Sequence, residues 1–422
     1  MLKIAWWQRL SWEVVISGSK NASLPIIAAS LFMDKVTLSN VPRIGDVLTF
    51  LEIIKSLNVW VDFVWNTLKL DTTAISLDNF NIELIKKIRV WILLLPILLY
   101  KFGEVNIPYP GWCNIWKRPI DEHIKWLEAI WYKNLNWEDF VKLSWDLWVW
   151  DRTLNWWFAV TATENLITAN VLRSWKTTLA LAAIEPHVID LVNFLKKAGA
   201  DIEVGFDHTI TINWVKNLKK EVEYSVVSDY IESGTFIIFW ALCSDKFIDI
   251  VNPRIADLSS FLLKAKEVWV KFEDLWNNKL RVYNSINSLK AIKVQTNIFP
   301  GFPTDLQSPF SILLTQAEWI SKIQEIMYEG RLNYLVEIEK MKGHPAILNP
   351  HEALIFGKTP LRATTVSSWD LRAWVAMIIA GLIATGDTYI TNVEYIDRWY
   401  EDIIGKIQKL WAVIERVKGE DN

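Results

Sequence analysis

Two patterns of apolar residues alternate along the chain. Amphipathic runs, in which apolar residues recur every three or four positions, predict helices. The clearest of them are Val188–Lys197, Leu258–Lys266 and Ile403–Leu410. Short runs rich in β-branched residues predict strands. The clearest of these are Thr209–Ile212, Phe247–Val251 and Thr388–Ile390. Because the two kinds of run alternate, the sequence predicts an α/β architecture.

One kind of junction recurs six times: a helical run ends, a single Gly, Trp or Asn follows, and a strand-like run begins. Its middle positions are Asn58, Trp131, Gly199, Trp269, Gly343 and Trp411. They are spaced 73, 68, 70, 74 and 68 residues apart, so six units of about 70 residues account for the chain. Six such units are too many for one core, so we expect two domains of three units each.

The middle position of each junction is expected to end a helix. Helices commonly stop at a residue in the left-handed conformation, which Gly adopts without a steric clash and Asn tolerates. Trp is a poor choice for that conformation, yet three of the six positions hold it.

The composition shows the same anomaly, with 26 Trp against only 15 Gly. Gly alone makes up roughly 7% of an ordinary globular chain. Some bacterial genetic codes translate UGA as glycine. Our hypothesis is that many or all of these Trp stand for glycines encoded by UGA.

The other totals exclude several classes of protein. At 51% hydrophobic and 22% charged residues, the chain is globular rather than disordered. A formal net charge of −3 argues against nucleic acid as a partner, and no apolar run reaches the roughly 18–20 residues of a membrane span. Two cysteines, Cys113 and Cys243, are too few for a disulfide framework. We therefore expect a cytoplasmic protein with no membrane partner.

Three motifs carry groups able to do chemistry. Lys20 and Asn21 follow a strand-like run and could present an ammonium and an amide to an anion, although a solvated lysine is the ordinary alternative. Cys113 lies five residues before Arg118 in a loop containing Pro and Gly. A nearby cation makes a thiol reactive, whereas a buried cysteine is inert. Asp305 ends a rigid turn, where it serves either as a general base or as a turn cap.

Arginines complete the set of candidate residues. Arg89, Arg331, Arg372 and Arg398 suit planar, bidentate binding of phosphate or carboxylate, although each alone is more often a surface ion pair. The five histidines show no metal-ligand spacing, and no Walker loop or dinucleotide fingerprint is present.

Taken together, these motifs resemble the enolpyruvyl transferases, and among them the branch that acts on UDP-N-acetylglucosamine. The resemblance runs from about residue 3 to residue 420. It rests on these segments: ISGSKNASLP from residue 16, PGWCNIWKRPID from 110, ATEN from 162, EP at 185, ESGT from 232, PGFPTD from 300, EGR from 329, DLRA from 370 and IDRWY from 396.

The resemblance also bears on the Trp hypothesis. The family pattern is PGGCxIGxRPxDxH where this chain has PGWCNIWKRPIDEH, so Trp112 and Trp116 stand on family glycines. Other Trp that fall on family glycines are Trp12, Trp131, Trp319, Trp374, Trp399 and Trp411.

The resemblance implies a two-domain, inside-out α/β barrel with six βαβαββ-type repeats, three in each domain. One domain would span 19–228 and carry the cysteine loop. The other would combine 1–18 with 229–422, with the active site in the cleft between them.

The resemblance further implies a reaction and its residues. The family transfers the enolpyruvyl group of phosphoenolpyruvate to the 3-hydroxyl of UDP-N-acetylglucosamine and releases phosphate, the first committed step of peptidoglycan synthesis. Cys113 would donate a proton and react with the antibiotic fosfomycin, and Asp305 would accept the proton of the sugar hydroxyl. Lys20 and Arg398 would bind phosphoenolpyruvate, and Asp370 would support the intermediate. No metal or organic cofactor is implied.

The substrate-binding positions implied by the resemblance come from both domains. They are Lys20, Asn21, Arg89, Arg118, Pro119, Ile120, Asp121, Glu122, Ala159, Val160, Thr161, Asp305, Met327, Arg331, Arg372 and Arg398. Two of them depart from the family pattern: Ala159 stands where Ser is usual, and Glu122 where apolar or amide residues are common.

Three alternatives compete with this prediction. The sister enzyme acting on shikimate 3-phosphate shares the fold and the chemistry but lacks the cysteine loop. A non-catalytic, sugar-binding protein would use the Trp as aromatic platforms, but that function predicts Trp gathered on one face. An inactive paralogue would not be expected to keep the whole set of charged residues.

Overall fold

The computed structural model describes most of the chain. The described residues are 1–5, 13–85, 88–108, 132–134, 140–145, 152–155, 158–367, 373–410 and 412–417. The chain divides into two compact units. Unit 1 combines 1–17 with 228–422, and unit 2 spans 18–227.

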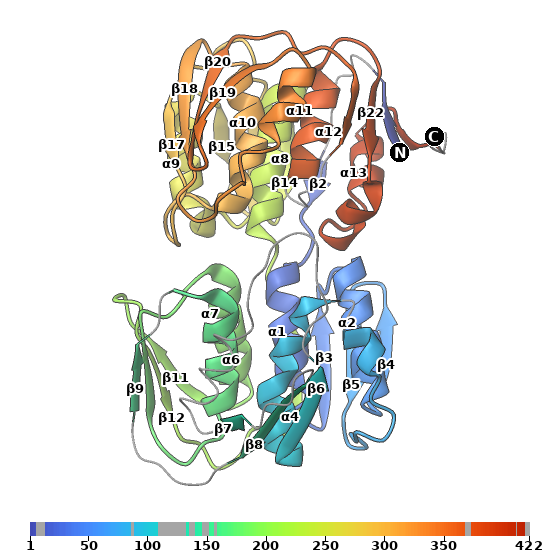
Figure 1. Cartoon of the computed structure of the whole chain (residues 1–422), viewed down its shortest axis with the longest axis vertical. Coiled ribbons are helices and arrows are strands. Elements are labelled where there is room, and N and C mark those ends of the chain that lie inside the picture. The colour runs from blue at the N-terminus through green and yellow to red at the C-terminus, as the bar shows by residue number, and fades with distance from the viewer. Residues whose placement is uncertain are drawn as a thin grey trace. The chain divides into compact units, whose positions relative to one another are not determined.

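Both units mix helices with strands (Figure 1). The helices of unit 2, with η for 3₁₀ helices, are α1 (Lys20–Ser30), α2 (Gly45–Ser56), α3 (Ile82–Ile85), η1 (Arg89–Leu94), α4 (Leu95–Phe102), α6 (Val160–Asn170) and α7 (Pro186–Lys197). Those of unit 1 are α8 (Tyr230–Cys243), η2 (Ile255–Leu258), α9 (Ser259–Glu267), η3 (Thr304–Leu306), α10 (Gln307–Thr315), α11 (Leu335–Lys340), α12 (Ala373–Ile383), η4 (Val393–Arg398) and α13 (Ile403–Lys409).

The strands are short. Unit 2 contains β3 (Lys35–Ser39), β4 (Trp60–Val64), β5 (Thr67–Asp71), β6 (Glu104–Pro108), β7 (Tyr132–Asn134), β8 (Phe140–Trp145), β9 (Arg152–Asn155), β10 (Thr177–Ala180), β11 (Asp201–Val204), β12 (Ile210–Asn213) and β13 (Glu221–Ser225). Unit 1 contains β1 (Leu2–Ile4), β2 (Glu13–Val15), β14 (Phe247–Val251), β15 (Phe272–Asp274), β16 (Lys279–Tyr283), β17 (Lys293–Gln295), β18 (Trp319–Gln324), β19 (His344–Asn349), β20 (Glu352–Gly357), β21 (Thr365–Ser367), β22 (Thr388–Thr391) and β23 (Ile414–Arg416).

Over the described residues these strands form six small sheets. Five sheets are four-stranded and share one order, in which a parallel pair is followed by two antiparallel pairings. Examples are β13-β3-β5-β4 in unit 2 and β2-β14-β16-β15 in unit 1. The sixth, β6-β8-β7, is three-stranded and antiparallel. The recurrence of one sheet pattern agrees with the repeat of about 70 residues in the sequence.

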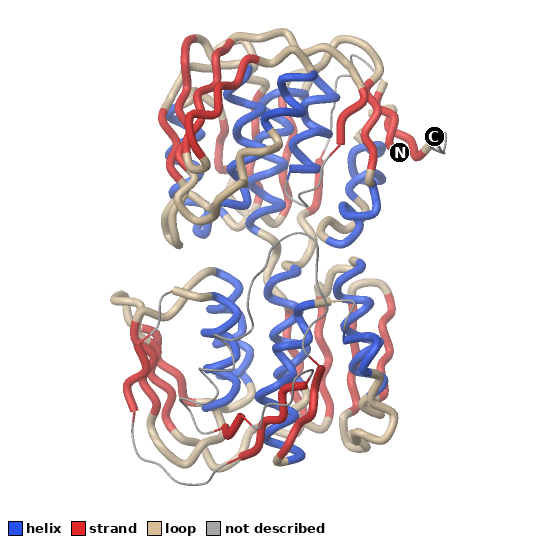
Figure 2. Tube along the Cα trace, viewed as in Figure 1, coloured by secondary structure: helices blue, strands red, loops and turns tan. Residues whose placement is uncertain are grey.

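Each unit places helices inside and sheets outside (Figure 2). In unit 1, helices α8, α10 and α12 pack against one another, and every residue of α8 is buried. In unit 2, α1, α6 and the η1–α4 segment pack together. A helix that is apolar all round is stable only when it is covered on every side. The predicted inside-out α/β fold is therefore confirmed. No helix in the described part of the chain is long and apolar enough to cross a membrane.

The predicted junctions end helices by the same hydrogen bonds. After α7, the N–H of Gly199 donates to the carbonyl of Lys196 and the N–H of Ala200 to that of Leu195. After α9, Trp269 and Val270 make the equivalent bonds to Lys266 and Ala265. This is the Schellman arrangement, in which the capping residue is left-handed. The φ angles of Gly199 and Trp269 are 105° and 72°, and that of Asn58 is 60°.

One junction corrects the prediction. The left-handed residue after α11 is Lys342, with φ of 64°, and not Gly343. Lys342 donates to Glu339 and Gly343 to Ile338, so the cap lies one residue earlier than expected. Gly343 is needed for a different reason, because a Cβ there would lie 2.4 Å from a side-chain carbon of Ile338. Trp131 and Trp411 lie outside the described residues.

Several Trp occupy environments that suit Gly better. Trp65, Trp269, Trp276 and Trp319 have positive φ angles between 52° and 76°, a genuine outlier for a bulky residue. Each of the four is more than half exposed, so the indole adds little packing. Three further Trp, at 91, 240 and 374, are fully buried, and their indole N–H groups have no hydrogen-bond partner. A buried Trp N–H usually has one.

Replacing Trp269 by Gly is expected to stabilise unit 1 by about 1 kcal/mol, because Gly adopts the left-handed conformation without the steric cost of a Cβ. The measurement is the denaturant midpoint of unfolding. Trp214 is the matched control: it is also half exposed and its φ is not positive. Trp214→Gly is expected to bring no gain, and an equal gain at both positions would contradict the explanation.

Candidate active site

The candidate residues of unit 2 begin at the start of α1. Just before this helix, the backbone at Gly18 passes close to the backbone of Asn40. Only Gly allows this, because a Cβ there would lie 1.7 Å from the carbonyl oxygen of Asn40. Ser19 caps the helix, and its hydroxyl accepts from the N–H of Ala22 at 3.4 Å. Lys20 is then the first helical residue and Asn21 the second. The chain therefore fixes the backbone of Lys20 tightly.

The ammonium of Lys20 is paired with a carboxylate that the sequence analysis did not identify. Its Nζ lies 2.6 Å from Oδ2 of Asp46 in the first turn of α2, and both side chains are almost fully buried. A buried charge requires such a partner. The pair fixes the position of the ammonium group at the start of α1.

The remaining described candidates of unit 2 lie at helix starts. Arg89 is the first residue of η1 and is half-buried. Ala159 is the N-cap of α6, followed by Val160 and Thr161, and no side chain caps the helix. Ser, the usual residue of the family pattern at 159, would supply a cap. Without it, the N-terminal amides of α6 lack a side-chain acceptor from this position.

Further along α6 lies a buried carboxyl, Glu164, near the half-buried Glu185. Burial, and secondly the neighbouring Glu185, raise the pKa of Glu164 well above its usual range. Glu185 is the N-cap of α7. These residues belong to the ATEN and EP motifs, but no pattern in the sequence predicts that they lie close together.

In unit 1, Asp305 lies on η3 at the end of the PGFPTD turn. Gly301 is required in that turn because a Cβ would lie 2.5 Å from Cβ of Asn297. The carboxylate of Asp305 is only 14% exposed, and its Oδ1 accepts from Nη1 of Arg331 at 3.2 Å. The structure thus brings together two residues that lie 26 positions apart in the sequence.

A buried glutamate organises the neighbourhood of that pair. Arg331 also donates to the hydroxyl of Thr304, which in turn donates to Oε2 of Glu325 at 2.7 Å. The other carboxylate oxygen of Glu325 accepts from the N–H of Met327 at 2.8 Å. Glu325 therefore positions both the guanidinium of Arg331 and the backbone of Met327, another candidate residue.

Asp229 is a second carboxyl close to Asp305. It caps α8, and its Oδ1 accepts from the N–H groups of Ile231 and Glu232 at 2.8 and 3.1 Å. Burial raises the pKa of Asp229 to about 6, with contributions from the charges of Glu232 and Asp305. The same surroundings and burial raise the pKa of Tyr400. Several acidic groups thus share one poorly hydrated region of unit 1.

Arg398 is the last residue of η4 and is half-buried. Two positions later comes Tyr400, whose hydroxyl lies 3.1 Å from that of Thr235 on α8. The other cysteine, Cys243, also belongs to α8, and burial raises the pKa of its thiol to about 12. A thiol of that kind is inert.

The remaining candidates lie outside the described residues. They are Cys113, Arg118, Pro119, Ile120, Asp121, Glu122, Asp370 and Arg372.

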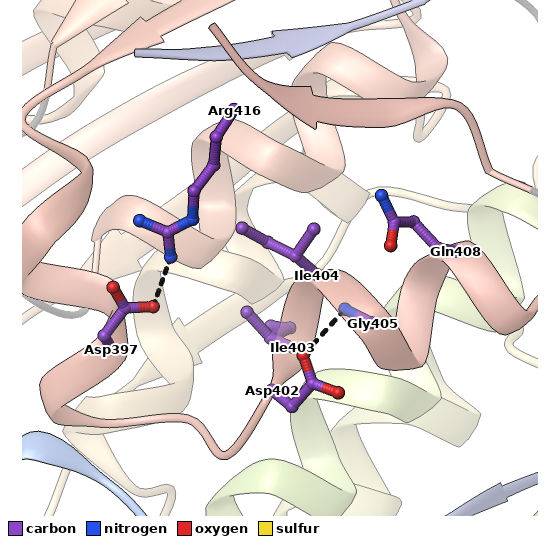
Figure 3. Close-up of a pocket in the computed structure, with 7 residues that line it drawn as sticks. All are labelled: Asp397, Asp402, Ile403, Ile404, Gly405, Gln408 and Arg416. Carbon is purple, nitrogen blue, oxygen red and sulfur yellow. Dashed lines mark hydrogen bonds and ion pairs between the residues drawn. The ribbon is translucent and has the colours of Figure 1, made fainter.

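A surface hollow of about 270 Å³ lies at the start of α13 (Figure 3). Its lining includes Asp397 and Arg416, which form an exposed ion pair at 2.5 Å, and Asp402, which accepts from the N–H of Gly405. None of the predicted site residues that the structure describes lines it. Over the described residues, no group of three or more His, Cys, Asp or Glu is placed to hold a metal ion.

Comparison with known proteins identifies the family. Residues 5–407 match the EPSP synthase (3-phosphoshikimate 1-carboxyvinyltransferase) family. The chain is 37% identical over 412 residues to the UDP-N-acetylglucosamine 1-carboxyvinyltransferase of Pelagibacter ubique, and the match covers 97% of both proteins. The chain belongs to the EPSP synthase family. The members of this family to which it is similar are carboxyvinyltransferases, an enzyme class, as the sequence predicted.

Further similar proteins are also named as enzymes of this kind. UDP-N-acetylglucosamine 1-carboxyvinyltransferase 1 of Clostridium acetobutylicum is 35% identical over 97% of this chain and 98% of its own length. Among solved structures, the enolpyruvyl transferase NikO from Streptomyces tendae superposes with a TM-score of 0.89 at 22% identity, covering 98% of each chain. EPSP synthase from Acinetobacter baumannii gives 0.76 at 13% identity over 98% of this chain and 99% of that one. At these identities the structures support the fold alone.

The stability of the protein is expected to fall as the pH rises from about 4 to about 6, in part because Asp229 ionises in a buried position. Its pKa is higher in the folded chain than in the unfolded one, so the unfolded state releases the proton first. Asp229→Asn keeps an N-capping side chain but cannot ionise. Relative to the unmodified chain it should gain about 2 kcal/mol between pH 4 and pH 7.

The measurement is urea unfolding of both chains across this pH range. Asp78→Asn serves as the control because Asp78 is exposed. A gain from Asp229→Asn that does not change with pH would show that ionisation is not its cause.

Proposed function

We propose that this protein transfers the enolpyruvyl group of phosphoenolpyruvate to the 3-hydroxyl of UDP-N-acetylglucosamine and releases phosphate. The observation that carries the proposal is similarity at 34–37% identity, over about 97% of the chain, to proteins named for this activity. The reaction would be the first committed step of peptidoglycan synthesis. The two cysteines of the chain are typical of a reducing compartment, which supports a cytoplasmic reaction.

The proposed chemistry is an addition followed by an elimination. Protonation of the methylene carbon of phosphoenolpyruvate by Cys113 leaves a cationic centre at the neighbouring carbon. The sugar oxygen bonds to that carbon and gives its proton to Asp305. The tetrahedral intermediate, supported by Asp370, then loses a proton from the methyl group and expels phosphate. Fixed charges around the substrate anions stabilise such charge development.

The described residues support these roles. Asp305 is well buried and is oriented by Arg331, as a general base needs to be. Lys20 is held by Asp46 and supplies a fixed cation for phosphate or carboxylate. Arg89, Arg118, Arg331, Arg372 and Arg398 complete the proposed cationic set.

We assign the sugar nucleotide to a second group of residues. Asn21, Asp305 and Met327 would contact the sugar, and the start of α6 at Ala159, Val160 and Thr161 would face the nucleotide. Amides at a helix start favour anions such as a diphosphate, which supports this placement. The other contributors would be Arg118, Pro119, Ile120, Asp121 and Glu122.

The rival functions have weaker support. The EPSP synthase structure is only 13% identical to this chain, so shikimate 3-phosphate is not favoured as the acceptor. A platform of Trp for sugar binding would need them on one face. The exposed Trp instead lie on different elements of both units, for example Trp65 in unit 2 and Trp319 in unit 1.

The decisive assay is phosphate release from phosphoenolpyruvate. We expect release only when UDP-N-acetylglucosamine is present, and loss of at least about a hundredfold in Cys113→Ala and in Asp305→Ala. Circular dichroism controls for folding of the variants. Phosphate release that depends on shikimate 3-phosphate instead would overturn the choice of acceptor.

We further propose that the Trp positions are glycines in the protein that the cell makes. Support comes from Trp112 and Trp116 on family glycines beside Cys113, and from exposed Trp with positive φ angles. Indoles at 112 and 116 would crowd the cysteine loop. We expect the literal chain to fold poorly or to lack activity, and the chain with Gly at all 26 positions to be active.

Two measurements test this proposal. The gene is expected to have UGA rather than UGG at these codons, and the assay above is expected to separate the two chains. UGG at every position, or equal turnover by both chains, would overturn it.

A further inference from the structure

A partly buried, hydrogen-bonded cluster in unit 1 includes none of the residues assigned above. Its members are Ser17, Glu232, Glu401 and Lys406, which we call the Ser17 cluster. Nζ of Lys406 donates to Oε1 of Glu232 at 2.5 Å and to Oγ of Ser17 at 2.6 Å. The hydroxyl of Ser17 donates to Oε2 of Glu401 at 2.7 Å. Three separate parts of the chain thus meet at one serine.

The donors and acceptors of the Ser17 cluster are matched. The backbone N–H of Ser17 donates to the second carboxylate oxygen of Glu232 at 2.9 Å, so both oxygens of that carboxylate accept a hydrogen bond. The side chains of Glu232 and Lys406 are only 5% and 16% exposed. Removing one partner of such a pair leaves a buried charge without compensation. The cluster therefore strongly favours one arrangement of the segments that it joins.

One of those segments carries Arg398. The stretch from η4 to α13 is bounded by two residues with left-handed backbones, Asn392 with φ of 60° and Asp402 with φ of 44°. It contains no strand. Glu401 lies three positions after Arg398, and Lys406 lies on the helix that follows. The hydrogen bonds of Glu401 and Lys406 therefore fix the C-terminal end of this irregular segment, just after Arg398, to Ser17 and α8.

The other segment leads to Lys20. The chain passes from unit 1 to unit 2 directly after Ser17. Ser17 therefore lies three positions before Lys20, which belongs to unit 2. Its carbonyl accepts from the N–H of Asp229 at 2.8 Å, so the main chain is fixed on both sides of the residue. The Ser17 cluster is thus connected along the chain to two of the cations proposed to bind phosphoenolpyruvate.

We propose that Lys406 is a positioning residue for phosphoenolpyruvate, acting through Glu232, Ser17 and Glu401 to hold the segment that bears Arg398. This inference rests on the proposed function. Lys406 touches no substrate in this role. Groups that orient a binding residue commonly change affinity severalfold or more when they are removed, because small displacements of the binding group are costly.

The test is steady-state kinetics of Lys406→Met with both substrates varied, in whichever version of the full chain is active in the phosphate-release assay. KM for phosphoenolpyruvate is expected to rise about tenfold, while KM for UDP-N-acetylglucosamine stays within about twofold. Lys406→Arg keeps the charge and should recover part of the loss. A purely structural role would lower the amount of active enzyme, and hence kcat, without changing KM for one substrate.

Lys409→Met is the matched control, because Lys409 lies on the same helix and is exposed. It should leave both KM values unchanged. Ser17→Ala gives a second, milder variant in case Lys406→Met fails to fold, since it removes only the hydroxyl between Lys406 and Glu401. It should raise the same KM in the same direction.

A double variant tests whether the residues act as one group. Lys406→Met combined with Glu232→Gln should raise KM for phosphoenolpyruvate by less than the product of the two single effects. If the active version of the chain turns over and KM for phosphoenolpyruvate is unchanged in both Lys406→Met and Ser17→Ala, only the positioning role is overturned. Absence of turnover both in the literal chain and in the chain with Gly at all 26 positions would overturn the proposed function and the positioning role with it.

Discussion

At the junctions that the structure describes, the chain ends a helix and enters a strand with only three or four residues between them, and one of these residues has a positive φ angle. Gly199 and Trp269 are such residues, with the same pair of hydrogen bonds after different helices. The inner helices and outer sheets can be arranged in three-unit groups only if every such turn is made. The constraint is therefore what links the spacing in the sequence to the architecture.

Three buried ion pairs organise the charges of the two units. The pairs are Lys20 with Asp46, Arg331 with Asp305, and Lys406 with Glu232. In each pair the two residues come from different elements, so the position of each cation depends on packing as well as on its own helix. Cations fixed before an anion arrives lose less freedom when it binds. For Lys20 and Arg331, this fixed position supports the proposed binding of an anionic substrate, whereas Lys406 is proposed to act only on the position of a neighbouring segment.

The sequence predicted helix ends better than it predicted side-chain partners. Spacing alone found the junctions at 58, 199 and 269, because a helix end is determined by neighbouring residues. It placed the cap after α11 at Gly343 rather than at Lys342. Gly is favoured at such caps on average, whereas here Gly is needed for its close approach to Ile338. Only the packing of α11 distinguishes these two uses of the same residue.

The sequence by itself determined the repeat, the fold class, and a set of candidate residues through their resemblance to a family. Only the tertiary structure decided which residues meet, such as Glu325 with Thr304, or Lys406 with Ser17, 389 positions away. The physical reason is that a hydrogen bond or ion pair between distant residues leaves no local pattern in the chain. Periodicity and turn chemistry are local, whereas the partner of a buried charge is determined by the packing of whole elements.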